Sequence, residues 1–242
     1  MRTLLTLAWW TLATPIVAAI TLPYAALTGD SDFLYRIGMW VVRAGIKLAG
    51  LRVRIVGRDK LDPSQTYIFM SNHASDIDPP LLIPLLPRRT SVLVKKELFR
   101  IPILGYAMRV AKLVAVNRQN RDSAVASVRA AAEVIRQGLD MTIFPEGTRS
   151  TDGRLLPFKK GPFYLALETG CPIVPVTLVG TFEILPKGKS LIRPEKAVAS
   201  IVFHAPIWPR DFQDRDSLIA AVRESINSAL PPERQSPIDN RK

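Results

Sequence analysis

The feature that most limits what this chain can fold into is a long uncharged stretch near its N-terminal end. Between Thr3 and Gly29 there is no charged residue, and the run from Leu4 to Leu27 consists mostly of Leu, Ala, Ile, Val and Trp. A helix needs about 20 apolar residues to cross a bilayer, so this run is long enough. We therefore expect membrane association. A cleaved signal peptide is the alternative, but its basic region would be a single Arg2 and no good cleavage site follows.

Two prolines leave the form of this membrane association open. Pro15 and Pro23 lie inside the apolar run, where a proline kinks or interrupts a helix. The run therefore predicts either a membrane-spanning helix or a broken hairpin or shallow re-entrant segment. It also contains aromatic residues of the kind that settle at a membrane interface, namely Trp9, Trp10 and Tyr24.

A second helical segment follows, with an apolar face opposite a basic face. It begins at a helix cap, Asp30-Ser31-Asp32, and ends at Gly50. The basic face carries Arg36, Arg43 and Lys47. Such a helix suits the headgroup region of a membrane, and a helix packed on a globular domain is the alternative. Positive charge after an apolar run also favours a catalytic domain on the cytoplasmic face.

From Arg52 onward, short apolar runs alternate with helical segments. The expected strands are Val53–Val56, Tyr67–Met70, Ser91–Val94, Leu113–Val116, Met141–Phe144, Ile173–Val179 and Ser200–His204. The expected helices are Pro80–Leu86, Asp122–Gln137, Pro162–Thr169 and Ser217–Leu230. Apolar strands between helices predict an α/β fold with a mixed, largely parallel sheet flanked by helices. We expect membrane-associating helices over 1–50, this α/β domain over 51–230 and a disordered tail over 231–242.

Composition narrows the classes of partner and of metal site. Lys and Arg exceed Asp and Glu by 33 to 21, a net charge of +12, which favours anionic partners such as phospholipid headgroups, phosphorylated metabolites, coenzyme A, acidic carrier proteins or nucleic acid. The single cysteine excludes an intramolecular disulfide and a thiolate metal cluster. With two histidines a His-rich metal site is excluded, although a mixed His and carboxylate site is not.

The first segment with potentially reactive side chains is a polar cluster at the end of an apolar strand. The sequence Ser71-Asn72-His73-Ala74-Ser75-Asp76-Ile77-Asp78 leads into Pro79-Pro80, which suit the first turn of a helix. A histidine can remove a hydroxyl proton near neutral pH, and a carboxylate can orient its ring. The spacing does not decide between Asp76 and Asp78. On an ideal helix His73 and Asp78 lie about 140° apart, so they meet only if the segment turns.

The second segment is a glycine- and arginine-containing loop after another apolar strand. The sequence Phe144-Pro145-Glu146-Gly147-Thr148-Arg149-Ser150 is followed by Lys159 and Lys160 before a helix. Gly147 allows close approach of the backbone to a ligand, and the fork of Arg149 suits phosphate. The lysines add cationic donors beside a helix N-terminus, which also attracts anions. The loop predicts a phosphate site; a solvated basic loop is the alternative.

Together the two segments resemble the paired signatures of the glycerolipid acyltransferase family, whose best-known members are the lysophosphatidic acid acyltransferases. The resemblance rests on Asn72-His73, Asp78 and the Phe144–Ser150 segment, about 70 residues apart, and extends over roughly residues 35 to 205. It implies that His73 is the general base and that Asp78 rather than Asp76 orients it. It also implies that the acceptor and its phosphate are bound by Glu146, Gly147, Thr148, Arg149 and, from a loosely matching block, Arg118.

The same resemblance implies the reaction and its partners. A fatty acyl group passes from acyl-CoA or an acyl-carrier protein to the hydroxyl of a 1-acyl-glycerol 3-phosphate at a membrane surface, forming phosphatidic acid, with no cofactor and no metal. Glycerol 3-phosphate or another lysophospholipid is the alternative acceptor. Asn72 and nearby backbone amides are candidates for stabilising the oxyanion. Ile173–Val176 matches a further block and is interpreted as core strand and acyl-site wall.

Competing functions remain open at this point. An acyl-enzyme route needs Cys171, which lies at the start of an apolar strand where a buried structural side chain is expected. A metallohydrolase would use His73, Asp76 and Asp78 but lacks a second cluster of ligands. A non-enzymatic basic protein of a membrane surface fits the charge, whereas scattered basic residues and few aromatics argue against nucleic acid. His204, in an apolar strand, is expected to be structural.

Overall fold

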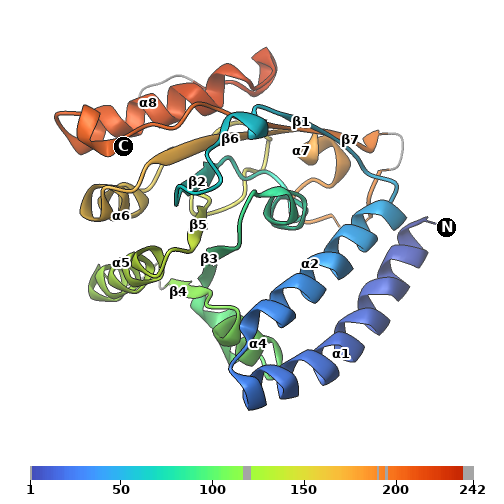
Figure 1. Ribbon diagram of the computed structural model, residues 1–242. Coiled ribbons are helices and arrows are strands. Elements are labelled where there is room, and N and C mark those ends of the chain that lie inside the picture. Colours follow the sequence, from blue (N-terminus) through green and yellow to red (C-terminus); the bar gives the residue numbers. More distant parts are fainter. Residues whose placement is uncertain (1, 117–120, 190, 194–195, 237–242) are drawn as a thin grey trace.

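The protein is built around a twisted seven-stranded sheet (Figure 1). The computed structural model describes residues 2–116, 121–189, 191–193 and 196–236. The strands are β1 (Arg52–Val56), β2 (Ile68–Ser71), β3 (Thr90–Lys95), β4 (Val114–Val116), β5 (Asp140–Ile143), β6 (Ile173–Val179) and β7 (Val198–Phe203). Their order is β1-β7-β6-β2-β5-β3-β4. Strands β6, β2, β5, β3 and β4 are parallel, β7 is antiparallel to β6, and β1 is parallel to β7.

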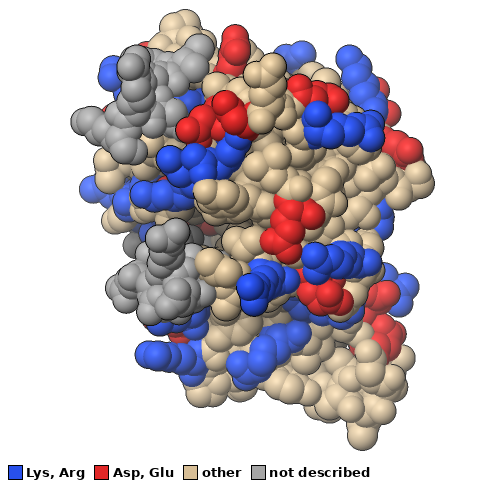
Figure 2. All heavy atoms as spheres, turned by 90° about the vertical axis from the view of Figure 1, so that its left-hand side faces the viewer, with Lys and Arg blue, Asp and Glu red and all other residues tan. Residues whose placement is uncertain are grey.

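Helices cover both faces of this sheet, which confirms the predicted fold class. Helices α5 (Arg121–Arg136), α6 (Gly161–Thr169) and α8 (Arg215–Ser228) lie on one side, on the left in Figure 1. The other face packs against α3 (Asp78–Leu82), the 3₁₀ turn η2 (Ile83–Leu85) and α7 (Thr181–Ile184). On the face turned towards the viewer in Figure 2, Lys and Arg side chains are interspersed with Asp and Glu. The surplus of positive charge is therefore not gathered there into a stripe for nucleic acid.

The apolar strands are explained by burial on both faces. In β2, Ile68 and Met70 contribute to the core under α5, α6 and α8, whereas Phe69 between them contributes to the core on the opposite face. All three side chains are fully buried. Side chains of a strand alternate between faces, so a strand covered on both sides has no polar period and appears as a continuous apolar run.

Two antiparallel helices precede the sheet and pack against each other. They are α1 (Arg2–Thr28) and α2 (Ser31–Leu48), and the Asp30 side chain caps α2 as predicted. Trp9 Nε1 donates a hydrogen bond to the Val41 carbonyl at 3.0 Å, and the ring of Trp10 lies against Gly45. Figure 1 shows the pair as a hairpin to the right of the sheet.

Helix α1 is continuous through Pro15 and Pro23, so of the two forms left open by the sequence the broken hairpin is wrong. Each proline removes one backbone donor, and packing along α2 outweighs that loss. The helix is long and apolar enough to cross a membrane, and most of its large side chains are exposed. These are Leu4, Leu5, Leu7, Leu12, Ile16, Ile20, Tyr24 and Leu27.

Element boundaries differ from the predicted ones where prolines and glycines interrupt a pattern. The helix expected over Pro80–Leu86 is divided into α3 and η2, with Pro84 inside η2. Helix α4 (Leu104–Val110) and the 3₁₀ turn η3 (Lys96–Arg100) before it were not predicted. The other 3₁₀ turns in the described residues are η1 (Arg58–Lys60), η5 (Pro209–Asp211) and η6 (Pro232–Arg234).

The expected disordered tail requires a correction. Residues 231–236 are folded onto the domain, because Arg234 of η6 forms an ion pair with Glu183 at 2.9 Å and donates a hydrogen bond to the Asp152 carbonyl. Arg234 also lies over the Phe182 ring. Residues 237–242 lie outside the described part of the chain.

The turn after β6 depends on a glycine, which gives a test of how closely this turn packs against β7. Gly180 has φ +87°, and a Cβ there would lie 2.5 Å from the Val198 carbonyl oxygen of β7. Gly170 also has positive φ, at +64°, but a Cβ there would meet no atom within 4 Å.

We expect Gly180→Ala to lower the free energy of unfolding by clearly more than Gly170→Ala. The control substitution costs about 1–2 kcal/mol from left-handed backbone strain alone, whereas Gly180→Ala adds a backbone clash. Thermal unfolding of the two variants in the same mild detergent measures the difference. Equal losses would contradict the close approach of the Gly180 turn to β7.

Candidate active site

The two polar segments meet because they follow neighbouring parallel strands. In the sheet β2 lies between β6 and β5, so the carboxyl ends of these strands share one edge. The chain leaves β2 towards β3 on one side, while β5 connects across β2 to β6 on the other. Sites of α/β proteins form where connections diverge in this way. The His73 loop after β2 and the Glu146–Ser150 loop after β5 are thus in contact.

His73 and Asp78 form a hydrogen-bonded pair. The Asp78 Oδ2 atom lies 2.7 Å from His73 Nδ1 and also accepts hydrogen bonds from the backbone amides of Ala74 and Ser75, both at 2.7 Å. The segment therefore turns around the Asp78 carboxylate, which is how residues five positions apart meet. Because a carboxylate accepts the Nδ1 proton, the lone pair of the ring is on Nε2, where it can act as a base.

The surroundings of the pair leave the imidazole accessible and the carboxylate enclosed. The His73 side chain is 17% exposed, whereas that of Asp78 is fully buried. The ring stacks on Phe144 with 4.2 Å between centroids. Phe144 belongs to the second segment, and its contact with His73 was missed by sequence reasoning. The ring is thus held by a hydrogen bond at one edge and an aromatic face on one side.

Asp76, which the spacing alone left as a rival to Asp78, has a different partner. Its carboxylate forms an ion pair with Arg149. Both side chains remain accessible, at 55% exposed for Asp76 and 30% for Arg149. The Lys187 ammonium donates to the Arg149 carbonyl at 2.9 Å, which fixes the backbone of the same loop. The structure therefore places the arginine of the second segment directly beside the histidine loop.

Glu146 was expected to line the acceptor site, and this is corrected by its burial. The residue is 2% exposed, and its two oxygens accept hydrogen bonds from His73 N at 2.7 Å and Leu156 N at 2.9 Å. In return Ser150 N donates to the His73 carbonyl at 2.8 Å. Both backbone groups of His73 are thus bonded to the second segment. Glu146 therefore positions the histidine, and its burial keeps it from lining an open site.

The Glu146 carboxyl is held in an unusual electrostatic environment. Burial raises its pKa to about 8, with a smaller contribution from the nearby charge of Asp78, while the two backbone amides and Arg223 act in the opposite direction. Arg223 is itself 2% exposed, and it donates to the Leu156 carbonyl at 2.6 Å. Burial lowers the pKa of its guanidinium, and the charge of Glu146 partly offsets that shift.

Arg223 was also missed by sequence reasoning, although a signal was present. It lies on the apolar face of α8, four positions after Ile219 and three before Ile226, and both of those side chains are buried. A charged residue inside an otherwise apolar helix face requires a buried partner, which here is supplied by the second segment.

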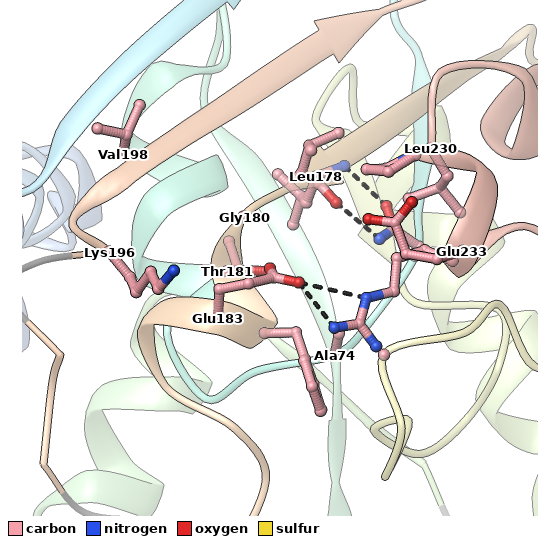
Figure 3. Close-up of a pocket in the computed structure, with 15 residues that line it drawn as sticks. Ala74, Leu178, Gly180, Thr181, Glu183, Lys196, Val198, Leu230 and Glu233 are labelled. Carbon is pink, nitrogen blue, oxygen red and sulfur yellow. Dashed lines mark hydrogen bonds and ion pairs between the residues drawn. The ribbon is translucent and has the colours of Figure 1, made fainter.

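Asn72 was proposed to stabilise an oxyanion, and the structure contradicts this role. Its Nδ2 donates to the Leu178 carbonyl at 2.9 Å, and its Oδ1 accepts from Leu178 N at 2.7 Å, as the dashed lines in Figure 3 show. The side chain is buried, so both ends of the amide are used to join the loop to β6. Asn72 therefore fixes the start of the histidine loop.

A cavity of about 370 Å³ borders this loop from the side of β6 and the C-terminal turn. Its wall includes Asn72 and Ala74, the two neighbours of His73, and Figure 3 shows Thr181, Glu183 and Glu233 from later elements around it. The Glu183–Arg234 ion pair lies in its wall. The cavity therefore adjoins the loop that carries His73.

The remaining predicted binding residues differ in how close they lie to the pair. Gly147 has φ +72°, and a Cβ there would lie 3.3 Å from Cγ of Lys159, so this lysine packs over the second segment. Thr148, Lys159 and Lys160 are exposed. Lys160 is the N-cap residue of α6, and neither lysine has an ion-pair partner among the described residues. Arg118 lies outside the described residues.

The structure argues against the cysteine route and gives His204 a structural contact. Cys171 is 6% exposed, and burial raises the pKa of its thiol to about 12, so the thiolate needed for attack is suppressed. His204 Nε2 lies 2.8 Å from the Thr177 hydroxyl, which also donates to the Ile226 carbonyl of α8. In the described part of the chain, His, Cys, Asp and Glu side chains form no group of three suited to a metal ion.

Comparisons with known proteins show which family this chain resembles. The model of a family described as Acyltransferase matches residues 52–179. A 1-acyl-sn-glycerol-3-phosphate acyltransferase of Chlamydomonas reinhardtii is 36% identical over 75% of this chain and 54% of its own length. One of Limnanthes alba is 42% identical over 62% of this chain and 53% of its own length. The chain thus spans about half the length of such curated relatives.

A solved structure extends the likeness to almost the whole chain. The crystal structure of the 1-acyl-sn-glycerophosphate (LPA) acyltransferase PlsC from Thermotoga maritima has a TM-score of 0.77 and 27% sequence identity. The match covers 93% of this chain and 95% of that one. It therefore includes the N-terminal helices as well as the sheet.

The raised pKa of Glu146 gives a test of its burial. The folded protein keeps the Glu146 proton up to a pH of about 8, whereas an unfolded chain loses it near 4.5. Between these values the folded state binds more protons, so stability falls as pH rises, by at most about 1.4 kcal/mol per pH unit from this group. We expect Glu146→Gln to remove that part of the slope.

The measurement is thermal unfolding from pH 5 to pH 8 for wild type and Glu146→Gln. The variant also leaves one backbone amide without an acceptor, a pH-independent cost of about 1–3 kcal/mol. Asp140, whose pKa burial raises to about 6, contributes a slope of the same sign to both proteins and cancels in the difference. Parallel pH profiles would contradict the buried, protonated Glu146.

Proposed function

This chain belongs to the acyltransferase family, and from that premise we propose that it transfers a fatty acyl group from an acyl thioester to the free hydroxyl of a 1-acyl-glycerol 3-phosphate, forming phosphatidic acid. The observation that carries the proposal is the accessible His73 imidazole held by the buried Asp78 carboxylate, beside a loop that presents Arg149. The first group suits a hydroxyl nucleophile, and the second suits the phosphate of the same acceptor.

The proposed reaction begins with His73 as a general base. Nε2 removes the proton of the acceptor hydroxyl as its oxygen attacks the thioester carbonyl carbon. The tetrahedral intermediate then expels the thiolate, which takes the proton from the imidazolium, leaving an ester and a free thiol. Asp78 stabilises the imidazolium and fixes the Nδ1–H tautomer through its 2.7 Å hydrogen bond. The thioester donor is an acyl-CoA or an acyl-carrier protein.

Phosphate binding is proposed for the loop after β5 and its neighbours. The partly exposed Arg149 side chain is paired with the exposed carboxylate of Asp76, so an incoming phosphate can compete with Asp76 for the guanidinium. Lys159 packs over Gly147 and can add a second positive charge, with Lys160, Thr148 and Arg118 as further contacts. Because the acceptor hydroxyl and phosphate are close neighbours on glycerol, the same molecule can reach Arg149 and His73.

The proposed location is the cytoplasmic face of a membrane, with residues 1–50 as the attachment and 51–230 as the catalytic domain. Helix α1 exposes apolar side chains along its length. It packs along α2, which exposes Arg36 and Lys47 and is tied to the domain by a hydrogen bond from Arg43 to the Pro84 carbonyl. A spanning α1 would draw these charges into the bilayer at high cost, so we propose that α1 lies in one leaflet.

The decisive experiment is acyl transfer by the purified protein, with radiolabelled acyl-CoA and acyl-carrier protein each offered three acceptors. These are 1-acyl-glycerol 3-phosphate, glycerol 3-phosphate and lysophosphatidylcholine. We expect labelled phosphatidic acid with the first acceptor. Preferential transfer to one of the others would reassign the acceptor. No transfer to any of them, with vesicle binding intact, would favour a non-enzymatic membrane protein.

Substitutions in the catalytic pair give the next test. We expect His73→Ala to lower kcat/KM by about 10³-fold or more and Asp78→Asn by about 10²-fold or more, because one removes the base and the other its orientation. His204→Gln, which alters the only other histidine, is the control and should keep near wild-type activity. Full activity of His73→Ala would eliminate the proposed mechanism.

A separate prediction concerns the phosphate contact. Arg149→Lys keeps the charge but loses the two-pronged geometry, so KM for 1-acyl-glycerol 3-phosphate should rise about 10-fold while kcat changes little. The matched control is Arg136→Lys, an arginine that also pairs with acidic side chains but ends α5 before β5 begins, whereas the second segment follows the end of β5. An unchanged KM in Arg149→Lys would remove this residue from the acceptor site.

A further inference from the structure

A second exposed apolar surface lies on the segment between β3 and β4. Residues 100–104 are all exposed, and the large apolar side chains of this segment and the first turn of α4 project from the domain. They are Ile101, Ile103, Leu104 and Tyr106, and Ile103 is 66% exposed. An exposed group of apolar residues on a folded domain usually marks a contact with a lipid or protein partner.

The backbone holds Ile103 in a conformation that such a residue avoids. Ile103 has φ +62° and ψ −58°, and the Leu104 amide donates to the Pro102 carbonyl at 2.6 Å. This is a γ-turn of the rare, strained kind, and a β-branched side chain with positive φ is a genuine outlier. Strain of this sort persists where the surrounding structure enforces it and is concentrated at functional positions.

The neighbours of the turn enforce this conformation. Gly105 donates to the Ile101 carbonyl at 2.8 Å, and a Cβ at Gly105 would lie 2.1 Å from the Phe99 carbonyl oxygen. The start of α4 is therefore packed closely on η3. Between these two elements the turn has no room to relax, and the Ile103 side chain stays on the outside.

Two observations identify what covers this surface. Helix α4 contacts α1, and Figure 1 shows α4 beside the N-terminal hairpin, so the apolar surface is continuous with that of the membrane-attached helix. Arg100 and Arg109 flank it in the chain and are exposed; Arg109 donates to the Phe99 carbonyl, and neither arginine forms an ion pair with a described carboxylate. Apolar residues between unpaired arginines match the boundary between acyl chains and anionic headgroups.

We propose that the Ile101–Tyr106 segment is a second membrane contact of this protein, in which the strained turn inserts Ile103 among the acyl chains of an anionic leaflet. It rests on the membrane attachment by α1 described above and adds a point on the catalytic domain itself. Together with α1 it extends one continuous apolar surface from the hairpin onto the catalytic domain, and contact at both places fixes the rotation of the domain about the hairpin. A single helix in a leaflet leaves that rotation free.

The test uses the fact that the chain has a single cysteine. In a Cys171→Ala background, I103C, L12C and V125C are each labelled with a polarity-sensitive fluorophore, and the full chain is returned to vesicles of phosphatidylglycerol and bromine-labelled phosphatidylcholine. Leu12 is an exposed residue of α1, and Val125 an exposed residue of α5 on the other side of the sheet. Thermal unfolding of each labelled variant verifies the fold.

The expected result is a blue shift and strong bromine quenching at positions 103 and 12, with neither at position 125. Quenching at 12 without quenching at 103 would overturn this inference alone and leave the attachment by α1 intact. Quenching at neither position would overturn both. Quenching to the same extent at all three would show non-specific adsorption and also reject the proposal. None of these readouts needs acyl transfer, so they are independent of the enzymatic assay.

Discussion

The buried carboxyl group of Glu146 joins the two halves of the candidate site. It accepts a hydrogen bond from the His73 backbone on one loop and from the Leu156 backbone further along the other. Together with the bond from Ser150 N to the His73 carbonyl, it leaves the backbone at His73 no freedom to move independently of the second loop. Asp78 then has only to orient a side chain whose origin is already fixed. The backbone bonds thus position His73, and Asp78 orients its ring.

The topology of the sheet makes this link possible. Strand β2 is central, with β5 on one side and β6 on the other, so the histidine loop is held from both neighbours. The Glu146 carboxyl group approaches from the β5 side, and the Asn72 amide reaches β6 on the other. A loop bonded on two sides is a rigid platform for a catalytic group, which is the condition for an oriented base.

The fold was predictable where the burial of an element is visible in its local sequence pattern. Apolar runs such as Ile68–Met70 indicated strands covered on both faces, and the sheet confirms it. Helix α4 was missed because Pro102 and Gly105 interrupt its pattern. The sequence also left open whether α1 runs unbroken through its two prolines, since this depends on packing against another helix.

For the site, the sequence indicated which residues gather but not what each one does. His73 and Arg149 belong to loops that do meet. Glu146 and Asn72 were misassigned because their partners are backbone groups 73 and 106 positions away, and no local pattern reports such a contact. A polar residue next to a reactive one is easily taken for a ligand contact. The structure shows that such a residue can instead hold the backbone in place through hydrogen bonds.

The C-terminal turn has a consequence for anything attached behind it. Arg234 ties η6 to Glu183 and to the Asp152 carbonyl, in the loop that continues from the phosphate-suited segment. A domain fused by a short flexible linker after Ser236 would start from this fixed point. Its effective concentration at the site would be on the order of millimolar. A weak binder tethered there could therefore occupy the site almost permanently, and a fused acyl donor could be delivered without a diffusional search.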